Sequence, residues 1–76
     1  SPHKTIIVEL DTDDADLSPY GEVVEQDGSR ISLRVPKAAT AGVTARLLAD
    51  LPVVDLTVEE PPIEEVIEQV FAQEAV

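Results

Sequence analysis

Apolar and polar residues alternate in three stretches of the chain, the pattern expected of strands with one buried face. Residues 4–10 (KTIIVEL) predict a first strand, and residues 53–59 (VVDLTVE) predict a last strand. Between them, residues 22–35 contain two β-rich runs separated by a turn signal, and Pro36 ends the second run. The chain is therefore expected to contain a four-stranded sheet.

An Asp-Gly pair at 27–28 lies between the two β-rich runs and is typical of a type I′ hairpin turn. A two-residue turn at that place fixes the register of the hairpin. It pairs Val24 with Ile31 on one face and Glu25 with Arg30 on the other. We expect the second pair to be a cross-strand ion pair.

Residues 37–51 predict a helix, because their apolar side chains recur every three or four positions. Residues 11–21 (DTDDADLSPYG) could hold a short helix that ends at Ser18-Pro19. After Pro61-Pro62 a last helix is expected. Its apolar stripe consists of Ile63, Val66, Ile67, Val70 and Phe71.

The predicted order is strand, short helix, strand, strand, helix, strand and a final helix. This is an α+β two-layer sandwich of the ferredoxin-like βαββαβ type, with an extra C-terminal helix. A meander without the first crossover is the structural alternative.

Strand alternation assigns an apolar inner face and a mostly polar outer face to the sheet. The inner face is expected to carry Ile6, Val8, Leu10, Val24, Ile31, Leu33, Val35, Val54, Leu56 and Val58. Ile7, Val23 and Val53 interrupt the polar outer face. The last helix could share the inner face, cross these three residues, or dock on another chain. We expect intramolecular packing, because a small domain has few apolar side chains to spare.

The amino-acid composition excludes several classes of function. The 76 residues make one small domain, 1–76, and 16 acidic against 5 basic residues give a net charge of -11. Such a charge argues against nucleic-acid binding, which needs clustered cations. With no Cys and a single His, the chain offers no thiol chemistry and no His-based metal site. No apolar run is long enough for a membrane helix.

Three clusters of charged residues are candidate sites. Asp11, Asp13, Asp14 and Asp16 resemble a calcium loop, but Ala15 and Asp16 occupy the positions where the pattern needs an oxygen ligand and Gly. The glutamates between 59 and 68 are better explained as a solvated helix face near the positive end of its dipole. Arg30, Arg34 and Lys37 could bind an anion, although pairing with neighbouring carboxylates is the stronger interpretation.

No phosphate-binding glycine loop or catalytic triad can be built from this sequence, so the chain itself is not expected to be an enzyme. It also contains no Met. We therefore expect it to be a domain excised from a larger protein, with residues 1–3 as linker or vector-derived residues.

The tail carries a family resemblance. Residues 53–71 (VVDLTVEEPPIEEVIEQVF) resemble the end of bacterial ABC-transporter ATP-binding subunits of the drug-export, daunorubicin-resistance-like group. In that group a strand and an acidic, proline-containing turn precede a helix that opens Leu-acidic-Glu-Val-Phe. The matching residues here are Ile63, Glu64, Glu65, Val66 and Ile67, with Ile in place of the usual Leu and of the usual Phe.

The resemblance implies a role in contacts. The larger protein would hydrolyse ATP with Mg²⁺, in an ATPase domain outside this chain, to drive export. The domain would contact its own ATPase domain, the second ATP-binding subunit or the membrane permease, with a homodimer as a further possibility. It would lie in the cytoplasm at the inner face of the membrane. The expected contact residues are Ile63, Glu64, Glu65, Val66, Ile67, Val70, Phe71, Ile7, Val23 and Val53.

A second hypothesis belongs to another class. Small ferredoxin-like domains also serve as ligand-sensing regulatory modules, which need a pocket with converging polar groups. The sequence identifies no such pocket.

Overall fold

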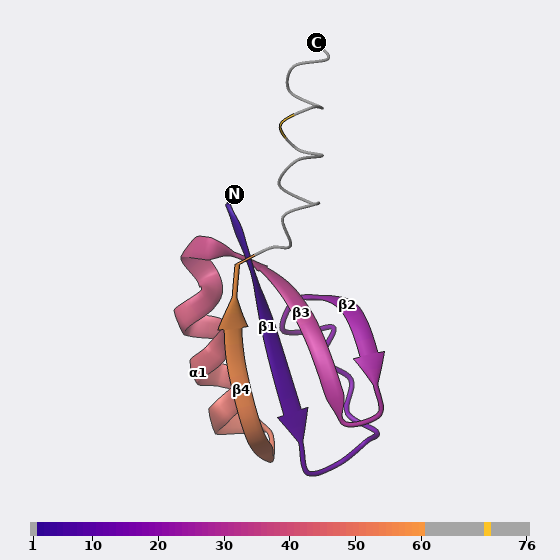
Figure 1. Cartoon of the computed structure of the whole chain (residues 1–76). Coiled ribbons are helices and arrows are strands. Elements are labelled where there is room, and N and C mark those ends of the chain that lie inside the picture. The colour runs from indigo at the N-terminus through magenta and orange to yellow at the C-terminus, as the bar shows by residue number, and fades with distance from the viewer. Residues whose placement is uncertain (1, 61–69, 71–76) are drawn as a thin grey trace.

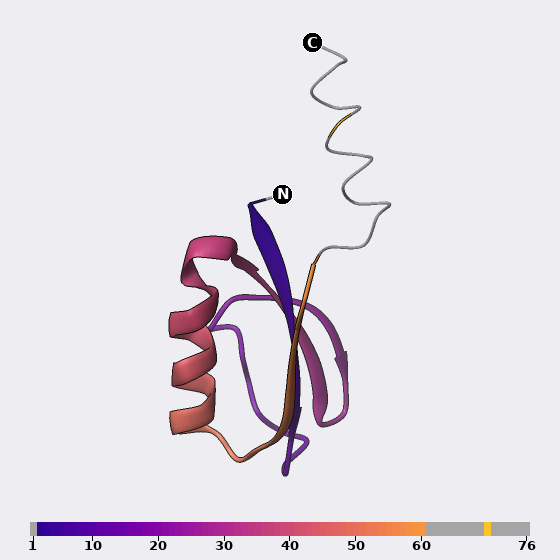
Figure 2. The same ribbon diagram turned by 60° about the vertical axis from the view of Figure 1, so that its left-hand side comes forward.

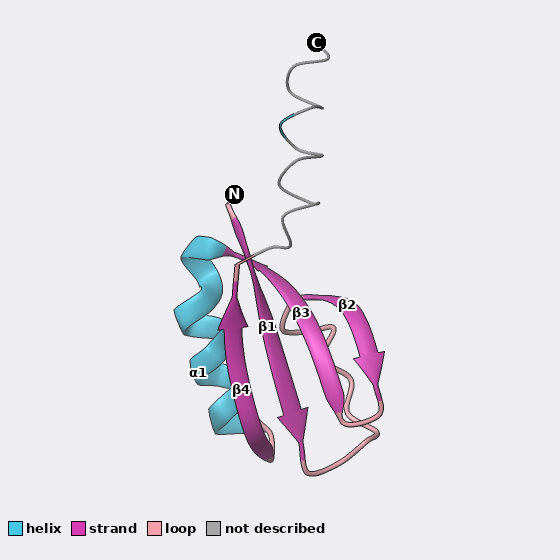
Figure 3. Cartoon of the chain, in the orientation of Figure 1, coloured by secondary structure: helices cyan, strands magenta, loops and turns pink. Residues whose placement is uncertain are grey.

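A four-stranded antiparallel sheet carries one α-helix on one face (Figures 1 and 3). The computed structural model describes residues 2–60 and Val70. The elements are β1 (His3–Leu10), β2 (Glu22–Asp27), β3 (Arg30–Pro36), the 3-10 turn η1 (Lys37–Ala39), α1 (Thr40–Asp50) and β4 (Val53–Glu59). The α+β class is confirmed. The predicted C-terminal helix lies outside the described residues, except that Val70 is helical.

The strand order is β2-β3-β1-β4, so β1 lies in the interior of the sheet between β3 and β4. Its alternation explains this position, since Ile6 and Val8 are fully buried on the helix-bearing face. The other buried apolar side chains that complete the core are Leu10, Leu17, Ile31, Leu33, Val35, Val43 and Leu47. β2 and β4 form the two edges.

The connection from β1 to β2 is a loop, so the short helix predicted within residues 11–21 is wrong. The Asp16 carboxylate accepts a hydrogen bond from the Ser18 backbone N–H at 3.0 Å, a local contact that competes with helical hydrogen bonding. Pro19 follows directly and lacks an N–H donor. The loop nevertheless covers the sheet on the side of α1 (Figure 2). Its Leu17 side chain is fully buried in the core.

A hydrogen bond ties this loop to α1. The Tyr20 hydroxyl donates to the Asp50 carboxylate at 3.0 Å, and the Arg46 guanidinium lies 4.9 Å from the centre of the tyrosine ring. The hydrogen bond to Asp50 raises the Tyr20 pKa, because only the protonated hydroxyl can donate it and ionisation would break it. The loop and α1 thus form one layer over the sheet.

The hairpin turn lies one residue later than predicted. Asp27 pairs with Arg30, which leaves Gly28 and Ser29 as the central residues. Gly28 has φ +60°, and no non-glycine residue in the described part has a positive φ. A type I′ turn needs positive φ at both centres, whereas type II′ needs it only at the first. The turn therefore fits the II′ pattern, and the predicted Glu25–Arg30 pair is wrong, because Glu25 faces Ser32.

Irregularities in the two edge ladders reverse four predicted side-chain positions. The register shifts between Val23 and Glu25, so Val23 faces the buried Leu33 and Val24 is 52% exposed. On the other edge Leu10 faces Val53, and Val54 is 64% exposed. An extra residue in one strand moves the following side chains to the opposite face. Val23 and Val53 therefore pack against the core instead of standing on the outer face.

Candidate interaction surface

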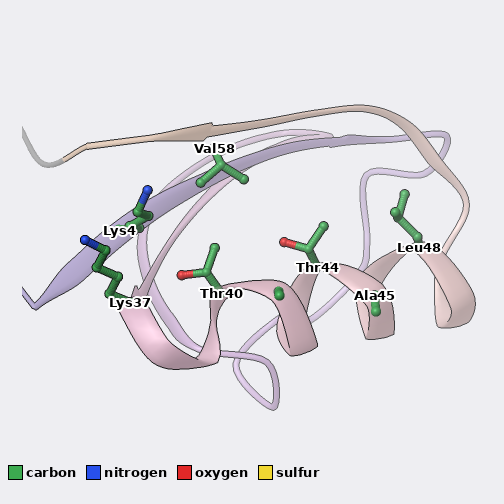
Figure 4. Close-up of a pocket in the computed structure, with 8 residues that line it drawn as sticks. Lys4, Lys37, Thr40, Thr44, Ala45, Leu48 and Val58 are labelled. Atoms are coloured by element: carbon green, nitrogen blue, oxygen red, sulfur yellow. The ribbon is translucent and has the colours of Figure 1, made fainter.

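An open groove runs between α1 and β4 on the helix-bearing side of the sheet, with a volume of about 640 Å³ (Figure 4). We call it the α1–β4 groove. Its lining is mostly apolar or small, with two lysines at one end. The lining residues are Lys4, Lys37, Thr40, Ala41, Thr44, Ala45, Leu48 and Val58.

The groove exists because α1 packs mainly on β1 and β3, while Val58 near the end of β4 stays partly exposed. Val43 and Leu47 point into the core, and the next face of the helix presents Thr40, Thr44 and Leu48, which are four residues apart. In Figure 4 these three side chains extend toward β4. Val58 faces the buried Ile6 across the ladder, yet it remains 41% exposed. Leu48 is 56% exposed.

Small side chains keep the groove open. Ala41 and Ala45 lie one turn apart on the helix and fill little of the space beside β4. Thr40 donates a hydrogen bond from Oγ1 to the Pro36 carbonyl at 3.2 Å. The Thr44 hydroxyl oxygen is buried and makes no hydrogen bond to any residue in 2–60. The helical wall thus offers mainly apolar contact, since the Thr44 oxygen is buried.

The lysine end of the groove lies where the chain leaves β4. Lys4 Nζ contacts Glu60 Oε1 at 3.0 Å. The hydrogen bond from Lys4 lowers the Glu60 pKa, and the charges of Lys4 and Lys37 lower it further. Two of the five cations of this acidic chain therefore meet at one end of the groove.

The outer face carries a second, smaller hollow of about 220 Å³ around Ile7, lined also by Glu25, Asp27, Arg30 and Ser32. Arg30 lies between Glu9 on β1 and Asp27 on β2 in the two registers. These acidic neighbours support the predicted carboxylate environment over an anion site.

The three cations that are close in sequence, Arg30, Arg34 and Lys37, do not all lie on this face. Arg34 shares the outer face with Arg30, since both alternate with the buried Ile31 and Leu33. Lys37 instead lines the α1–β4 groove. The three cations therefore cannot bind one anion together, because Lys37 lies on the opposite side of the sheet from Arg30 and Arg34.

The acidic loop forms local hydrogen bonds. Thr12 Oγ1 donates to Asp14 Oδ1 at 2.5 Å, and the Ser18 backbone N–H lowers the Asp16 pKa by hydrogen bonding to its carboxylate. Among residues 2–60 and Val70, no three acidic or histidine side chains are grouped as a metal site would require.

The predicted contact residues fall into three places. Ile7 is on the outer face, and Val23 and Val53 pack against the core. Val70 is helical and 48% exposed. The others, Ile63, Glu64, Glu65, Val66, Ile67 and Phe71, lie outside the described residues.

Sequence reasoning missed the groove itself. Its signal was present in the helix, where Thr40, Ala41, Thr44 and Ala45 place a strip of small side chains beside the apolar stripe. Such small side chains leave open space beside the helix, because none of them is large enough to fill it. The position of Lys4 at its end depends on the pairing of β1 with β4, which the sequence pattern does not supply.

Comparison with known proteins gives one family. A family model described as the C-terminal domain of EvrA-like ABC transporters matches residues 2–59. No curated protein and no solved structure matches the chain. Within the described residues, no helix has the length and apolar character needed to cross a membrane.

Proposed function

The chain belongs to the EvrA-like ABC-transporter C-terminal domains, and on this basis we propose that it is the contact-making accessory domain of an ATP-binding subunit. The larger subunit would couple hydrolysis of ATP with Mg²⁺ to export, in the manner of the drug-export, daunorubicin-resistance-like group. The domain would work in the cytoplasm at the inner face of the membrane. Its partners would be its own ATPase domain, the second ATP-binding subunit and the permease.

The observation that carries the contact role is the exposed α1–β4 groove. Leu48 and Val58 are large apolar side chains that a domain of this size would ordinarily bury. Contiguous exposed apolar surface beside charged residues is typical of protein interaction sites. Moreover, the sequence contains no phosphate-binding loop, which supports a role other than ATP hydrolysis for this domain.

The sheet order supports a finer structural proposal. We propose that the domain is a ferredoxin-like sheet whose first helix has been replaced by the loop of residues 11–21. Loss of that helix would leave α1 and the loop of residues 11–21 to cover this face of the sheet.

Titration by NMR tests the proposed contact role. The ATP-binding domain of the same subunit, added to the ¹⁵N-labelled chain, should shift the amide signals of Thr44, Ala45 and Leu48 in a saturable way. ATP with Mg²⁺ alone should leave all signals unchanged. Leu48→Glu should abolish binding, whereas Val24→Glu, at an equally exposed apolar residue on β2, should not. Absence of binding, or saturable shifts with ATP alone, would overturn the proposal.

The ligand-sensing alternative also has an observation in its favour. The groove has the size of a small-molecule site, and it combines apolar walls with two lysines. A medium-chain fatty acid serves as a probe, because its tail and carboxylate match these groups. Micromolar binding that Lys37→Met weakens would favour the sensor.

A further inference from the structure

Apolar side chains are exposed at several places in the described residues, Val24 on β2 and Val54 on β4 included, and two further places match one another. One is the α1–β4 groove, with Leu48 and Val58 exposed. The other is represented by Val70, which is helical and 48% exposed. In sequence, Val70 belongs to the apolar stripe of residues 61–76. Both surfaces are apolar with charged residues beside them, so the stripe that includes Val70 is suited to pack into the α1–β4 groove.

Their charges and apolar groups follow the same order. Along the groove, Lys4 and Lys37 come first, and Ala45 and Leu48 follow toward the other end of α1 (Figure 4). Along the segment, two adjacent glutamates at 64–65 follow Ile63 and precede most of the larger apolar residues, among which Glu68 lies. A segment that entered at the lysine end would place its glutamates beside the lysines. Its apolar residues would then lie beside the alanine and leucine.

The lengths of the two surfaces also agree. The groove follows α1, whose 11 residues span about 16 Å at 1.5 Å per residue. Residues 61–76 would extend for about 24 Å if helical throughout, at the same rise per residue. The segment is therefore long enough to cover the groove completely.

The point where the chain leaves β4 disfavours occupation of the groove by its own segment. β4 runs toward the lysine end and finishes there, with Glu60 held by Lys4. To enter its own groove, the chain would have to reverse direction immediately after this point. Pro61 and Pro62 follow, and a residue that precedes a proline is restricted to extended conformations. The sequence at the exit thus favours continuation away from the domain.

We propose that residues 61–76 of one copy occupy the α1–β4 groove of a second copy, and that the exchange is reciprocal. The resulting dimer is closed by a two-fold axis, so each copy donates one segment and accepts one. A stiff connection that prevents a segment from folding back on its own domain is a known route to such exchange. This inference rests on the proposed contact role of the groove and names its partner as the second copy of this chain, so the ATPase domain would bind there only by displacing the exchanged segment.

Disulfide trapping tests the exchange directly, because the chain contains no cysteine. Two single variants, Ala45→Cys in the groove and Phe71→Cys in the segment, are mixed and oxidised. We expect the mixed disulfide to be the main cross-linked product. The matched control replaces Ala45→Cys by Ile7→Cys, on the outer face of the sheet, and should give at least tenfold less mixed product.

The double variant Ala45→Cys with Phe71→Cys separates exchange from folding back. Exchange predicts covalent dimers in non-reducing electrophoresis, whereas folding back predicts a monomer with an internal disulfide. The internal disulfide would overturn the inference, as would equal mixed product in the groove and outer-face experiments.

Sedimentation of the unmodified 76-residue chain provides a measurement without cysteine. We expect a dimer at about 100 µM for the parent and a monomer for Leu48→Glu that still folds and melts cooperatively, because Leu48 lies outside the core. A monomeric parent chain would overturn the exchange. If that monomer still bound the ATP-binding domain through its groove, the proposed function would stand while this inference failed.

Discussion

At the scale of single residues, the backbone of Gly21 lies very close to its neighbours on β3. A Cβ built at this position would lie 2.8 Å from Val35 Cγ1 and 3.3 Å from the Arg34 carbonyl oxygen. Both neighbours belong to β3, and Val35 is part of the core, so neither can move without disturbing the sheet. Gly21 therefore allows the loop to enter β2 directly against β3.

Gly21→Ala is expected to destabilise the domain by about 1–3 kcal/mol, the usual cost of overpacking. Chemical denaturation of the variant and the parent chain measures the difference. Gly42→Ala is the matched control, since a Cβ there meets nothing within 4 Å and alanine favours the helix. It should stabilise the domain by up to about 1 kcal/mol. Equal effects of the two substitutions would contradict the close approach.

Gly28 tests the corrected turn. Its φ of +60° is unfavourable for side chains of L-residues, so Gly28→Val should destabilise by about 1–3 kcal/mol. Synthesis of the chain with D-alanine at this position gives the control, because a D-residue prefers positive φ. That chain should melt at or above the temperature of the parent. If valine and D-alanine had the same effect, the strain would lie elsewhere.

Glu60 provides a prediction on pH. Because Lys4 lowers its pKa in the folded state, the pair stabilises the fold above the ordinary glutamate pKa. That contribution is lost as the pH falls through the lowered value. NMR titration of the Glu60 carboxyl carbon should show a midpoint below that of an unstructured peptide, and Lys4→Met should raise it. The same midpoint in both proteins would show that the pair does not form in solution.

At the scale of elements, the loop of residues 11–21 covers part of the sheet, as the predicted helix would have done. It contributes the buried Leu17 to the core, and Tyr20 connects it to α1 through Asp50. A helix would satisfy its backbone groups internally, whereas this loop uses side chains such as Asp16. Stability of the layer should therefore depend strongly on one apolar side chain.

Leu17→Ala is expected to destabilise the domain by about 2–5 kcal/mol, since truncating a fully buried leucine leaves a cavity. Asp13→Ala, at an exposed position of the same loop, should change stability by less than about 0.5 kcal/mol. Urea denaturation monitored by circular dichroism compares the two variants. A small effect of Leu17→Ala would mean that the loop is not part of the folded core.

The elements themselves were well predicted from the sequence, because alternation and helical spacing are local signals. Residues 4–10 and 53–59 formed strands, and residues 37–51 contained the helix, although its first turn is 3-10. Side-chain facing failed at Val24 and Val54, where an extra residue interrupts the ladder. Nothing in the local sequence marks such an insertion, because it depends on the register of the neighbouring strand. The groove went unpredicted for the same reason.

At the scale of the whole molecule, the large negative net charge destabilises the folded state. Sixteen acidic residues face five basic ones, and like charges repel most strongly in the folded state, where they lie closest together. Local contacts such as Lys4 with Glu60 are exposed and contribute little. Salt should therefore affect this domain through its net charge.

We expect the melting temperature to rise by several degrees between about 10 and 300 mM NaCl, since the screening length shrinks from about 30 Å to below 10 Å. Calorimetry over this range measures the trend. An equal osmolality of glucose controls for solute effects and should give a smaller change. A melting temperature that falls with salt would show that specific ion pairs outweigh the net repulsion.

The irregular ladders at both sheet edges have a consequence for solubility. An exposed strand with regular hydrogen bonding invites another strand to pair with it, which can lead to fibrils. β2 and β4 are the two edges, and an extra residue interrupts the regular pairing of each. Carboxylates at Glu25 and Asp55 add repulsion between identical edges. The domain can therefore expose an apolar groove for a specific partner while its edges discourage indiscriminate sheet growth.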